Sequence, residues 1–256
     1  MRHVRFRDYA GNVRTGEWTG EEGAEITAHP GHGSRIALES ETFAVDDVEV
    51  LPPCEPSKVV CIGLNYADHA DEQGEEVPDR PLLFLKTPNT VTSHGETVEL
   101  LADKDRIDYE AELGVVISDP CRNVSPGEAE SVIAGFTCVN DVSNRDDQAL
   151  EQNWVRGKAF DDACPLGPVL ATPEEVPRDA AVECRVNGEV RQSSSREEFI
   201  FSVRELIAEI TNYMTLETGD VISTGTPAGV GPISHGDTVE VEVEGVGTLR
   251  NEFRAP

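Results

Sequence analysis

Short apolar segments separated by turn residues run along most of this chain, and they restrict its possible fold more than any other feature. The strands that they predict lie at residues 58–64, 80–87, 108–117, 237–245 and 247–253. One clear amphipathic helix is predicted, in which Val203, Leu206, Ile207 and Ile210 recur at helical spacing and Gly219 stands just past the end. Many short strands with few helices are typical of a β-rich α+β fold.

Three other segments carry weaker structural signals. Residues 65–73 are expected to form a short polar helix or a mobile loop, and residues 126–141 a helix that runs into a strand ending at Asp141. Residues 155–168 are rich in Gly and Pro and are expected to form a loop, whereas Asn187-Gly188 predicts a hairpin turn. No G-x-G-x-x-G pattern follows a strand, which argues against a dinucleotide-binding fold.

The first 50 residues form a separate β-type region. A hairpin is expected around the turn at residues 10–12, and the segment Gly31–Ser34 and an acidic stretch follow it. Prolines at positions 52, 53 and 56 then interrupt the chain. We therefore expect a small β-rich N-terminal segment over residues 1–52 and a larger domain over residues 53–256.

The charge balance excludes several kinds of partner. The 256 residues contain 21 Lys and Arg against 49 Asp and Glu, which gives a formal net charge of −28. Nucleic acids and anionic lipid surfaces both require a basic face, so neither is expected as a partner. Arginine outnumbers lysine by 17 to 4. Such an acidic, lysine-poor composition favours a halophilic protein, because molar salt shortens the Debye length to about 3 Å and screens the self-repulsion.

The same composition favours a cytoplasmic location. No apolar run approaches the roughly 20 residues of a membrane-spanning helix, and the N-terminus lacks the apolar core of a signal peptide. The cysteines show no C-x-x-C pair or zinc-ribbon spacing and are expected to be reduced; they stand at positions 54, 61, 121, 138, 164 and 184.

Glu110, Glu112 and Asp141 are the first candidate site. Two carboxylates two residues apart on a strand point to the same face of the sheet, and Asp141 ends another predicted strand. Three converging carboxylates would suit a hard cation such as Mg²⁺, Mn²⁺ or Ca²⁺. In a chain with 49 acidic residues, an exposed acidic face is the alternative.

His69 and Glu72 are a second candidate pair. On a helix, residues three positions apart share a face, so the carboxylate would orient the imidazole and raise its basicity. Such a pair suits a general base that acts on water. The alternative is an exposed histidine with a chance acidic neighbour, since Asp68, Asp71 and Glu75 are also close in sequence.

Lysines and a glycine-rich turn complete the candidates. Lys86 ends a strand and Lys158 lies in the Gly- and Pro-rich segment; either ammonium could stabilise an enolate or oxyanion. The segment 223–232 contains Thr224 and Thr226 and could offer N–H groups and a hydroxyl to an anion. Surface lysines and a tight structural turn are the alternatives.

The order of these motifs resembles the fumarylacetoacetate hydrolase family. KVVCIGLNYADHADE, PLLFLKTPNT, DYEAELGVVI, VNDVSNRDDQ, GKAFDDACPLGP and LETGDVISTGTPAGVGP follow one another between about residues 50 and 250. The resemblance implies a catalytic domain with a rolled mixed sheet, preceded by a short β-rich N-terminal segment, and a homodimer. It also implies a divalent metal, Mg²⁺ or else Mn²⁺ or Ca²⁺.

The resemblance further implies roles for individual residues. The metal ligands would be Glu110, Glu112 and Asp141. The catalytic groups would be a dyad on a mobile lid element and a nearby lysine, which match His69, Glu72 and Lys158. The residues that match positions close to substrate are Lys86, Arg145, Gln148 and Thr226.

The resemblance implies a small 2-oxo or 2,4-dioxo acid as substrate. We expect hydrolysis of a C–C bond in an acylpyruvate or fumarylpyruvate type of acid, with water activated by His69 and an enolate as leaving group. Decarboxylation of oxaloacetate, or isomerisation of 2-hydroxyhepta-2,4-diene-1,7-dioate, are the alternatives. An acidic protein with a structural metal, or a dioxygenase with two histidines and one carboxylate, fits the motifs less well.

Overall fold

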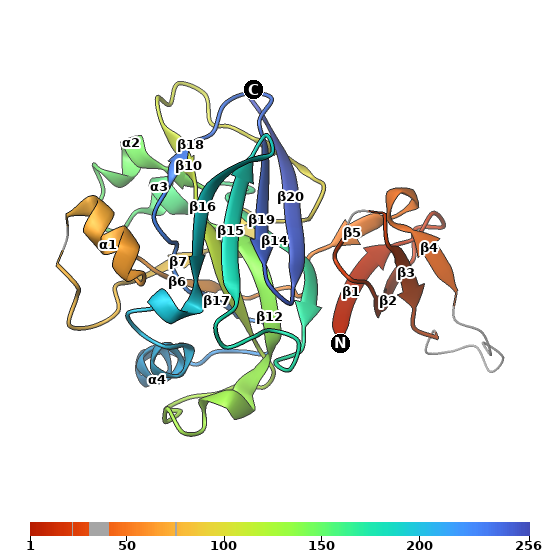
Figure 1. Ribbon diagram of the computed structural model, residues 1–256, viewed down its shortest axis with the longest axis horizontal. Helices are drawn as coiled ribbons and strands as arrows, with labels where there is room; N and C mark the ends of the chain where they lie inside the picture. The colour runs from red at the N-terminus through yellow and green to blue at the C-terminus, as the bar shows by residue number, and fades with distance from the viewer. Residues whose placement is uncertain (22, 31–40, 75) are drawn as a thin grey trace.

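The computed structural model describes residues 1–21, 23–30, 41–74 and 76–256, and it confirms the β-rich α+β fold. The segment Gly31–Ser34 lies outside the described residues. The described residues form three sheets, and the N-terminal strands make a lobe beside the larger body (Figure 1). Among the residues described, no helix has the length and apolar character needed to cross a membrane.

The largest sheet has 12 strands and joins the lobe to the body. Its main path runs β4-β3-β2-β1-β14-β12-β11-β17-β6-β7, while β5 pairs with β1 and β8 pairs with β14. The strands are β1 (Arg2–Arg7), β2 (Val13–Glu17), β3 (Glu25–Ala28), β4 (Thr42–Ala44), β5 (Glu49–Leu51), β6 (Val59–Ile62), β7 (Leu83–Lys86), β8 (Val91–Thr92), β11 (Ala111–Ile117), β12 (Ile133–Asn140), β14 (Cys164–Ala171) and β17 (Val221–Ser223).

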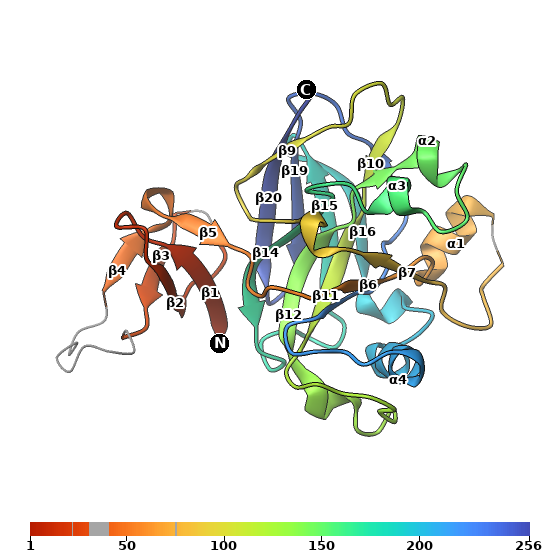
Figure 2. The ribbon, with the colours of Figure 1, turned by 180° about the vertical axis from the view of Figure 1, so that it is seen from behind.

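Two smaller sheets complete the body (Figure 2). The five-stranded sheet runs β16-β15-β19-β20-β9, and the three-stranded sheet runs β13-β10-β18. Their strands are β9 (Thr97–Glu99), β10 (Ile107–Tyr109), β13 (Ser143–Asn144), β15 (Ala181–Val186), β16 (Glu189–Ser195), β18 (Gly231–Pro232), β19 (Thr238–Val243) and β20 (Gly247–Arg254). The predicted hairpin at Asn187-Gly188 is confirmed, since β15 and β16 pair across it.

Helices are few and mostly short, as predicted. They are α1 (Ala67–Gln73), α2 (Arg145–Gln148), α3 (Val155–Lys158) and α4 (Val203–Tyr213), with 3₁₀ turns at Val45–Asp47, Pro88–Thr90, Ala129–Val132 and Arg196–Glu198. Helix α4 begins with a capping box, in which Ser202 and Glu205 satisfy each other's backbone N–H groups. Its apolar face is buried, so the helical spacing in the sequence does reflect packing.

The helix followed by a strand that is expected at residues 126–141 is present, although the helical part is only a short 3₁₀ turn at Ala129–Val132 before strand β12 begins at Ile133. Two other local predictions were wrong. Helix α4 ends at Tyr213, well before Gly219, because Leu216 forms a β-bridge with Cys121 and requires extended chain. Lys158 lies in the short helix α3 rather than in a loop; Gly157 allows that helix to pack against Gln148.

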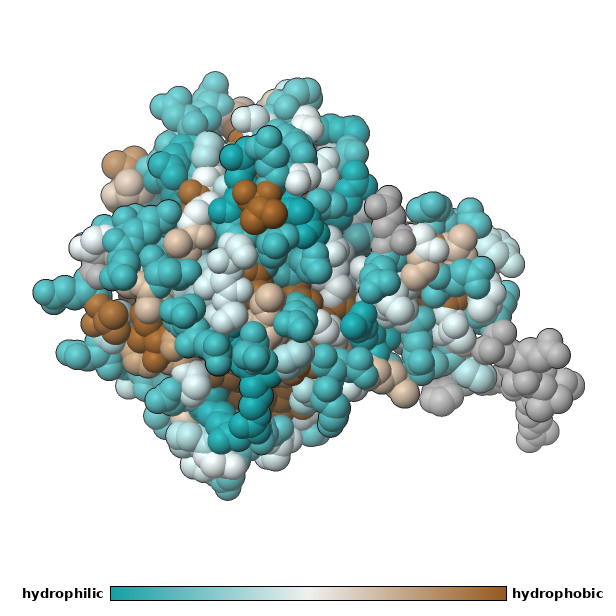
Figure 3. Space-filling view, viewed as in Figure 1, coloured by the Kyte–Doolittle hydropathy of each residue, from teal (hydrophilic) through white to brown (hydrophobic). Residues whose placement is uncertain are grey.

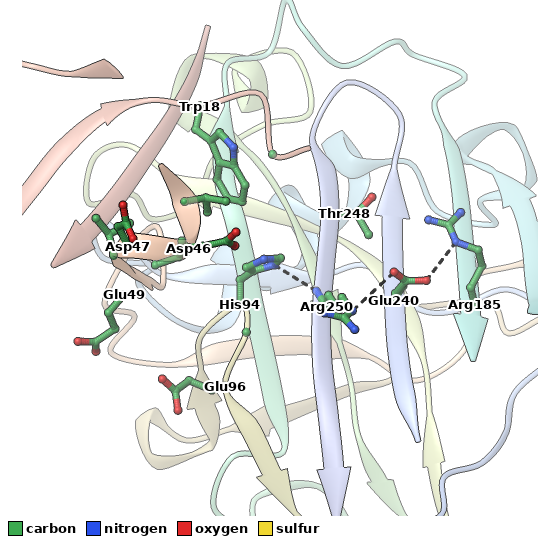
Figure 4. Close-up of a pocket in the computed structure, with 15 residues that line it drawn as sticks. Trp18, Asp46, Asp47, Glu49, His94, Glu96, Arg185, Glu240, Thr248 and Arg250 are labelled. Carbon is green, nitrogen blue, oxygen red and sulfur yellow. Dashed lines mark hydrogen bonds and ion pairs between the residues drawn. The ribbon is translucent and has the colours of Figure 1, made fainter. Parts of the chain in front are cut away.

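The N-terminal lobe is attached through the large sheet. Strand β1 pairs with β14 of the body as well as with β2 and β5 of the lobe. Beside this attachment, a cavity of about 650 Å³ lies between Trp18 of the lobe and His94, Arg185 and Arg250 of the body (Figure 4). The boundary at residues 52 and 53 stays a prediction; in the structure it follows β5 directly. The face shown in Figure 3 is mainly hydrophilic, in keeping with the charge.

Candidate metal centre

Three carboxylates converge at the centre of the large sheet. Glu110 precedes β11, Glu112 lies within it, and Asp141 directly follows the neighbouring strand β12. One oxygen atom of each lies within 4.8 Å of the others, and the three residues are 6%, 1% and 0% exposed. Within the described residues this is the one such group of three potential ligands. The alternative of an exposed acidic face is therefore wrong for these residues.

Three cations compensate the buried negative charge. Lys158 Nζ donates to Glu110 Oε2 at 2.9 Å and to Asp141 Oδ2 at 2.7 Å. Arg145 Nη2 donates to Glu110 Oε1 at 2.5 Å. On the other side, Lys86 Nζ lies 2.7 Å from Asp141 Oδ1. Burying carboxylates without such partners would cost several kcal/mol each.

The compensation is uneven, and the pKa values show it. Burial opposes ionisation of Glu110, but the charges of Lys158 and Arg145 outweigh it and lower its pKa to about 2. Burial, together with the charges of Asp141 and Glu110, raises the pKa of Glu112 to about 8. Burial alone would lower the pKa of Lys158, but Asp141 and Glu110 raise it above its usual value. The protein's own cations thus leave the carboxylate group short of positive charge around Glu112.

The donor set fits a divalent cation. All three side chains present carboxylate oxygens, which are the ligands that Mg²⁺, Mn²⁺ and Ca²⁺ prefer. Asp141 Oδ1 is buried and lies 2.7 Å from the Lys86 ammonium, which among the described residues donates its hydrogen bonds to the Val142 and Ala163 carbonyls instead. Because Glu112 is short of positive charge, a cation between the three carboxylates would compensate the negative charge that remains. Glu110, Glu112 and Asp141 are therefore the residues that would hold the metal.

The glycine-rich segment after β17 anchors Glu112. Ser223 Oγ and the Gly225 N–H donate to Glu112 Oε2 at 2.5 and 2.9 Å. The segment thus binds an anion, as its composition predicts, but the anion is a carboxylate of the protein itself. Ser223 and Gly225 were not among the predicted site residues, and the glycine-rich composition was the signal that pointed to them. Thr224 has a structural contact, since its hydroxyl donates to the Leu113 carbonyl.

The predicted dyad is formed on α1. His69 Nδ1 lies 3.2 Å from Glu72 Oε2, and His69 is mostly buried while Glu72 is exposed. The Gly229 N–H donates to both oxygens of Glu72 at 3.1 and 3.2 Å. Because the same loop contacts Glu112 through Gly225, one stretch of chain connects the dyad with the carboxylate group. Of the helix and the loop that were both expected for residues 65–73, the structure has the helix, over Ala67–Gln73.

Arg145 and Gln148 lie together on α2. Arg145 Nη1 donates to Gln148 Oε1 at 2.8 Å, which turns the amide nitrogen of Gln148 away from Arg145. Arg145 Nε donates to Asp108 Oδ2 at 2.8 Å, and Asp108 is fully buried. Asp108 therefore sets the direction of the guanidinium. The sequence analysis missed Asp108, although its position two residues before Glu110 could have placed it on the same face.

Thr226 and Lys86 are both held by the protein. Thr226 Oγ1 donates to the Ala111 carbonyl at 3.0 Å, between the two glutamates. Lys86 is fully buried, and its Nζ donates to the carbonyls of Val142 and Ala163 at 3.1 and 2.7 Å. The contacts of both residues with substrate stay predictions.

A family model described as the C-terminal part of fumarylacetoacetate (FAA) hydrolase matches residues 58–254. The chain belongs to the fumarylacetoacetate hydrolase family. The match leaves out the N-terminal lobe and includes each residue of the triad, the dyad and α2.

Relatives within the fumarylacetoacetate hydrolase family include enzymes with different reactions. The oxaloacetate tautomerase YisK of Bacillus subtilis is 41% identical over 230 residues, or 84% of this chain and 76% of that protein. The crystal structure of 5-carboxymethyl-2-hydroxymuconate delta-isomerase from Mycobacterium smegmatis is 39% identical with a TM-score of 0.88, covering 100% of this chain and 99% of that one. These matches confirm the predicted family and fold.

A third relative was solved with ligands in place. Fumarylpyruvate hydrolase from Pseudomonas aeruginosa, in complex with Mn²⁺ and pyruvate, is 29% identical with a TM-score of 0.74, covering 86% of this chain and 94% of that one. At least one member of the fumarylacetoacetate hydrolase family has therefore been solved with Mn²⁺ bound. The relatives named here are enzymes, so this chain is an enzyme of the same family whose reaction class the names alone do not specify.

Proposed function

We propose that this chain is a divalent-metal-dependent enzyme that interconverts the enol and keto forms of a 2-oxo dicarboxylic acid such as oxaloacetate. The observation that carries the proposal is the buried triad, with Lys158 Nζ 2.7 and 2.9 Å from two of its carboxylates. A site of this kind stabilises an enolate. The loop 223–229 connects it to the His69–Glu72 dyad, which can transfer a proton.

Each group of residues has a separate role in the proposed reaction. A divalent cation bound by the triad would polarise the 2-oxo group and favour the enolate. Lys158 adds positive charge beside it. His69 Nδ1 faces Glu72, which leaves Nε2 to take a proton from C3 and return it to the oxygen on C2, so no atom is gained or lost. Glu72 stabilises the charged imidazole between the two transfers.

Two of the three relatives favour a proton shift over bond cleavage. Those at 41% and 39% identity are named as a tautomerase and an isomerase, whereas the hydrolase is 29% identical. Tautomerases and isomerases leave the carbon skeleton intact. The same residues serve such a reaction without positioning a water molecule for attack.

Hydrolysis of a C–C bond in a 2,4-dioxo acid is the second candidate, and the dyad favours it. An imidazole oriented by a carboxylate can activate water, whose oxygen would attack the distal carbonyl. The C–C bond would then break, releasing a carboxylic acid and the enol of pyruvate. The similarity to a fumarylpyruvate hydrolase supports this reaction for the same scaffold.

One set of assays distinguishes these reactions. Enol oxaloacetate and acetylpyruvate are given to the enzyme in molar KCl with Mg²⁺ or Mn²⁺, and then with EDTA. We expect faster enol–keto conversion of oxaloacetate, lost with EDTA and reduced at least about 100-fold in His69→Asn. Cleavage of acetylpyruvate without an effect on oxaloacetate would replace the proposal by hydrolysis. Release of CO₂ from oxaloacetate would make the enzyme a decarboxylase, and inactivity on both substrates would contradict both candidates.

A further inference from the structure

Gln192 is an unusual residue for its position. It is 1% exposed, while every other residue of β16, the edge strand of the five-stranded sheet, is exposed or half-buried. The pairing with β15 shifts here: Gln192 faces Cys184 and Val190 faces Arg185, so Arg191 is the extra residue of a β-bulge. Bulges redirect the side chains next to them and are common beside active sites.

The side-chain amide of Gln192 reaches the strand that carries the two glutamates. Its Oε1 accepts from the Ala111 N–H at 2.9 Å, between Glu110 and Glu112. Its Nε2 donates to Thr226 Oγ1 and to the Pro227 carbonyl, both at 2.8 Å. Because Thr226 Oγ1 donates to the Ala111 carbonyl, both backbone polar groups of Ala111 on this side are satisfied.

Gln192 and Thr226 bond to β11 where, among the described residues, no neighbouring strand pairs with it on this side. Strand β17 pairs with β11 only from Gly114 to Val116, and the chain leaves the ladder after Ser223. Beyond that point, Gln192 and Thr226 supply the hydrogen bonds that a longer β17 would have supplied to Ala111. The metal-binding part of β11 is therefore held on this side by side chains rather than by a backbone ladder.

The orientation of the amide is determined by its partners. Its oxygen faces an N–H group and its nitrogen faces a carbonyl and a hydroxyl oxygen. A flipped amide would place donor against donor and acceptor against acceptor. Both hydrogens and the oxygen are thus in use, and a buried amide with fully satisfied bonds gives a rigid connection.

We propose that Gln192 is a positioning residue that fixes the metal-binding strand β11 to the Thr226 loop and so sets the separation of Glu110 and Glu112 from the rest of the centre. The inference rests on the metal site of the proposed function. If Gln192 has this role, the affinity for the metal depends on a residue that contacts neither the metal nor the substrate. Residues of this kind change metal affinity by about 10- to 100-fold when they are replaced.

Replacement of Gln192 by Met tests this, because Met keeps the volume and removes all three hydrogen bonds. Mn²⁺ affinity is measured by electron paramagnetic resonance of the free ion, without substrate, at a temperature where the variant is fully folded. We expect Gln192→Met to bind Mn²⁺ about 10- to 100-fold more weakly than the wild type. At saturating Mn²⁺, kcat should stay reduced while KM changes little.

Asn251→Leu is the matched control. Asn251 is another buried amide, which donates to the carbonyls of Ser93 and Glu96 in a different part of the body. Its loss should lower the melting temperature comparably and leave Mn²⁺ affinity within about twofold. Unchanged Mn²⁺ affinity in Gln192→Met, or an equal loss in Asn251→Leu, would overturn the inference. A wild type that binds Mn²⁺ but converts neither substrate would remove the proposed reaction and leave the role of Gln192 testable by the same titration.

Discussion

The candidate metal centre and the cavity beside the N-terminal lobe both pair basic with acidic side chains, but at different depths. At the centre, Lys86, Lys158 and Asp141 are 0–3% exposed and pair at 2.7 Å. Around the cavity, Arg185 and Arg250 share Glu240 at 3.5 and 3.9 Å, on side chains that are 23–48% exposed (Figure 4). The two regions therefore contain comparable charges at very different depths.

The burial of an ion pair determines how much its loss changes the stability of the protein. Exposed ion pairs contribute about 0–1 kcal/mol and weaken in salt. Removing one partner of a buried pair costs about 3–5 kcal/mol, because the other charge stays buried without compensation. Such a cluster is expensive to build, and a protein retains one where function requires it. The comparison thus separates the charges that make the surface acidic from those that form the site.

Asp141→Asn should have the largest effect. It removes a proposed metal ligand and leaves Lys86 and Lys158 without their shared carboxylate. Mn²⁺ affinity should fall by more than the roughly 100-fold expected for residues that merely support ligands. Turnover should fall below detection. Glu240→Gln at the cavity is the control, measured by the same Mn²⁺ titration, and a loss of affinity there would contradict the distinction between the two regions.

Lys86→Met should be the most destabilising change outside the ligands. It removes the lysine donor from the carbonyls of Val142 and Ala163, of which the second keeps the Val142 N–H, and it leaves Asp141 with less compensation. The free energy of unfolding in urea should fall by about 3–5 kcal/mol. Arg185→Met, which removes the partly exposed pairs with Glu183, Glu240 and Glu242, should cost about 0–1 kcal/mol in the same experiment. Equal losses in the two variants would show that depth does not decide the outcome.

The convergence of the three carboxylates could be predicted from the sequence because its signal is local. Glu110 and Glu112 share a face at a spacing of two residues, and Asp141 lies where an apolar strand ends. The depth of Lys86 could not be predicted, since the carbonyls that enclose it come from residues 56 and 77 positions away. Gln192 was missed for the same reason. Its burial depends on a bulge and on two segments distant in sequence.

Salt should change the stability contributed by the surface charges and leave that of the buried ion pairs unchanged. The net charge of −28 lies mainly on the surface, where molar KCl screens the repulsion. The melting temperature should therefore rise as KCl increases from about 0.1 M to 2 M, while Debye lengths fall from about 10 Å to below 3 Å. The destabilisation caused by Lys86→Met should persist at high salt, whereas that of Arg185→Met should disappear. Thermal unfolding of the three proteins across the salt series checks both statements, and a wild type that loses stability in KCl would argue against the predicted halophilic character.

His94 should give the smallest effect, through pH. Burial, and then the charge of Arg250, lower the pKa of His94 to about 4 from 6.5, and its Nδ1 accepts the Arg250 N–H at 3.2 Å. In the unfolded chain, His94 takes up a proton as pH falls below about 6.5, while in the folded protein it stays neutral until about pH 4. Neutral His94 therefore contributes fully to the free energy of unfolding above pH 6.5. As pH falls toward 4 this contribution is lost progressively, by about 1–2 kcal/mol after allowance for partial exposure.

His94→Gln isolates that contribution from the many carboxylates that titrate nearby. The difference in unfolding free energy between the wild type and His94→Gln should shift in favour of the variant as pH falls from 7.5 to about 5. Urea unfolding at both pH values measures it. Replacement of His94 should leave Mn²⁺ affinity unchanged at either pH, because the residue lines the cavity beside the lobe and, among the described residues, forms no hydrogen bond or ion pair with Glu110, Glu112 or Asp141. If the difference in unfolding free energy between the two proteins is the same at pH 7.5 and 5, the imidazole is protonated as readily in the folded protein as in the unfolded chain. The cavity would then expose His94 to water as fully as the protein surface does.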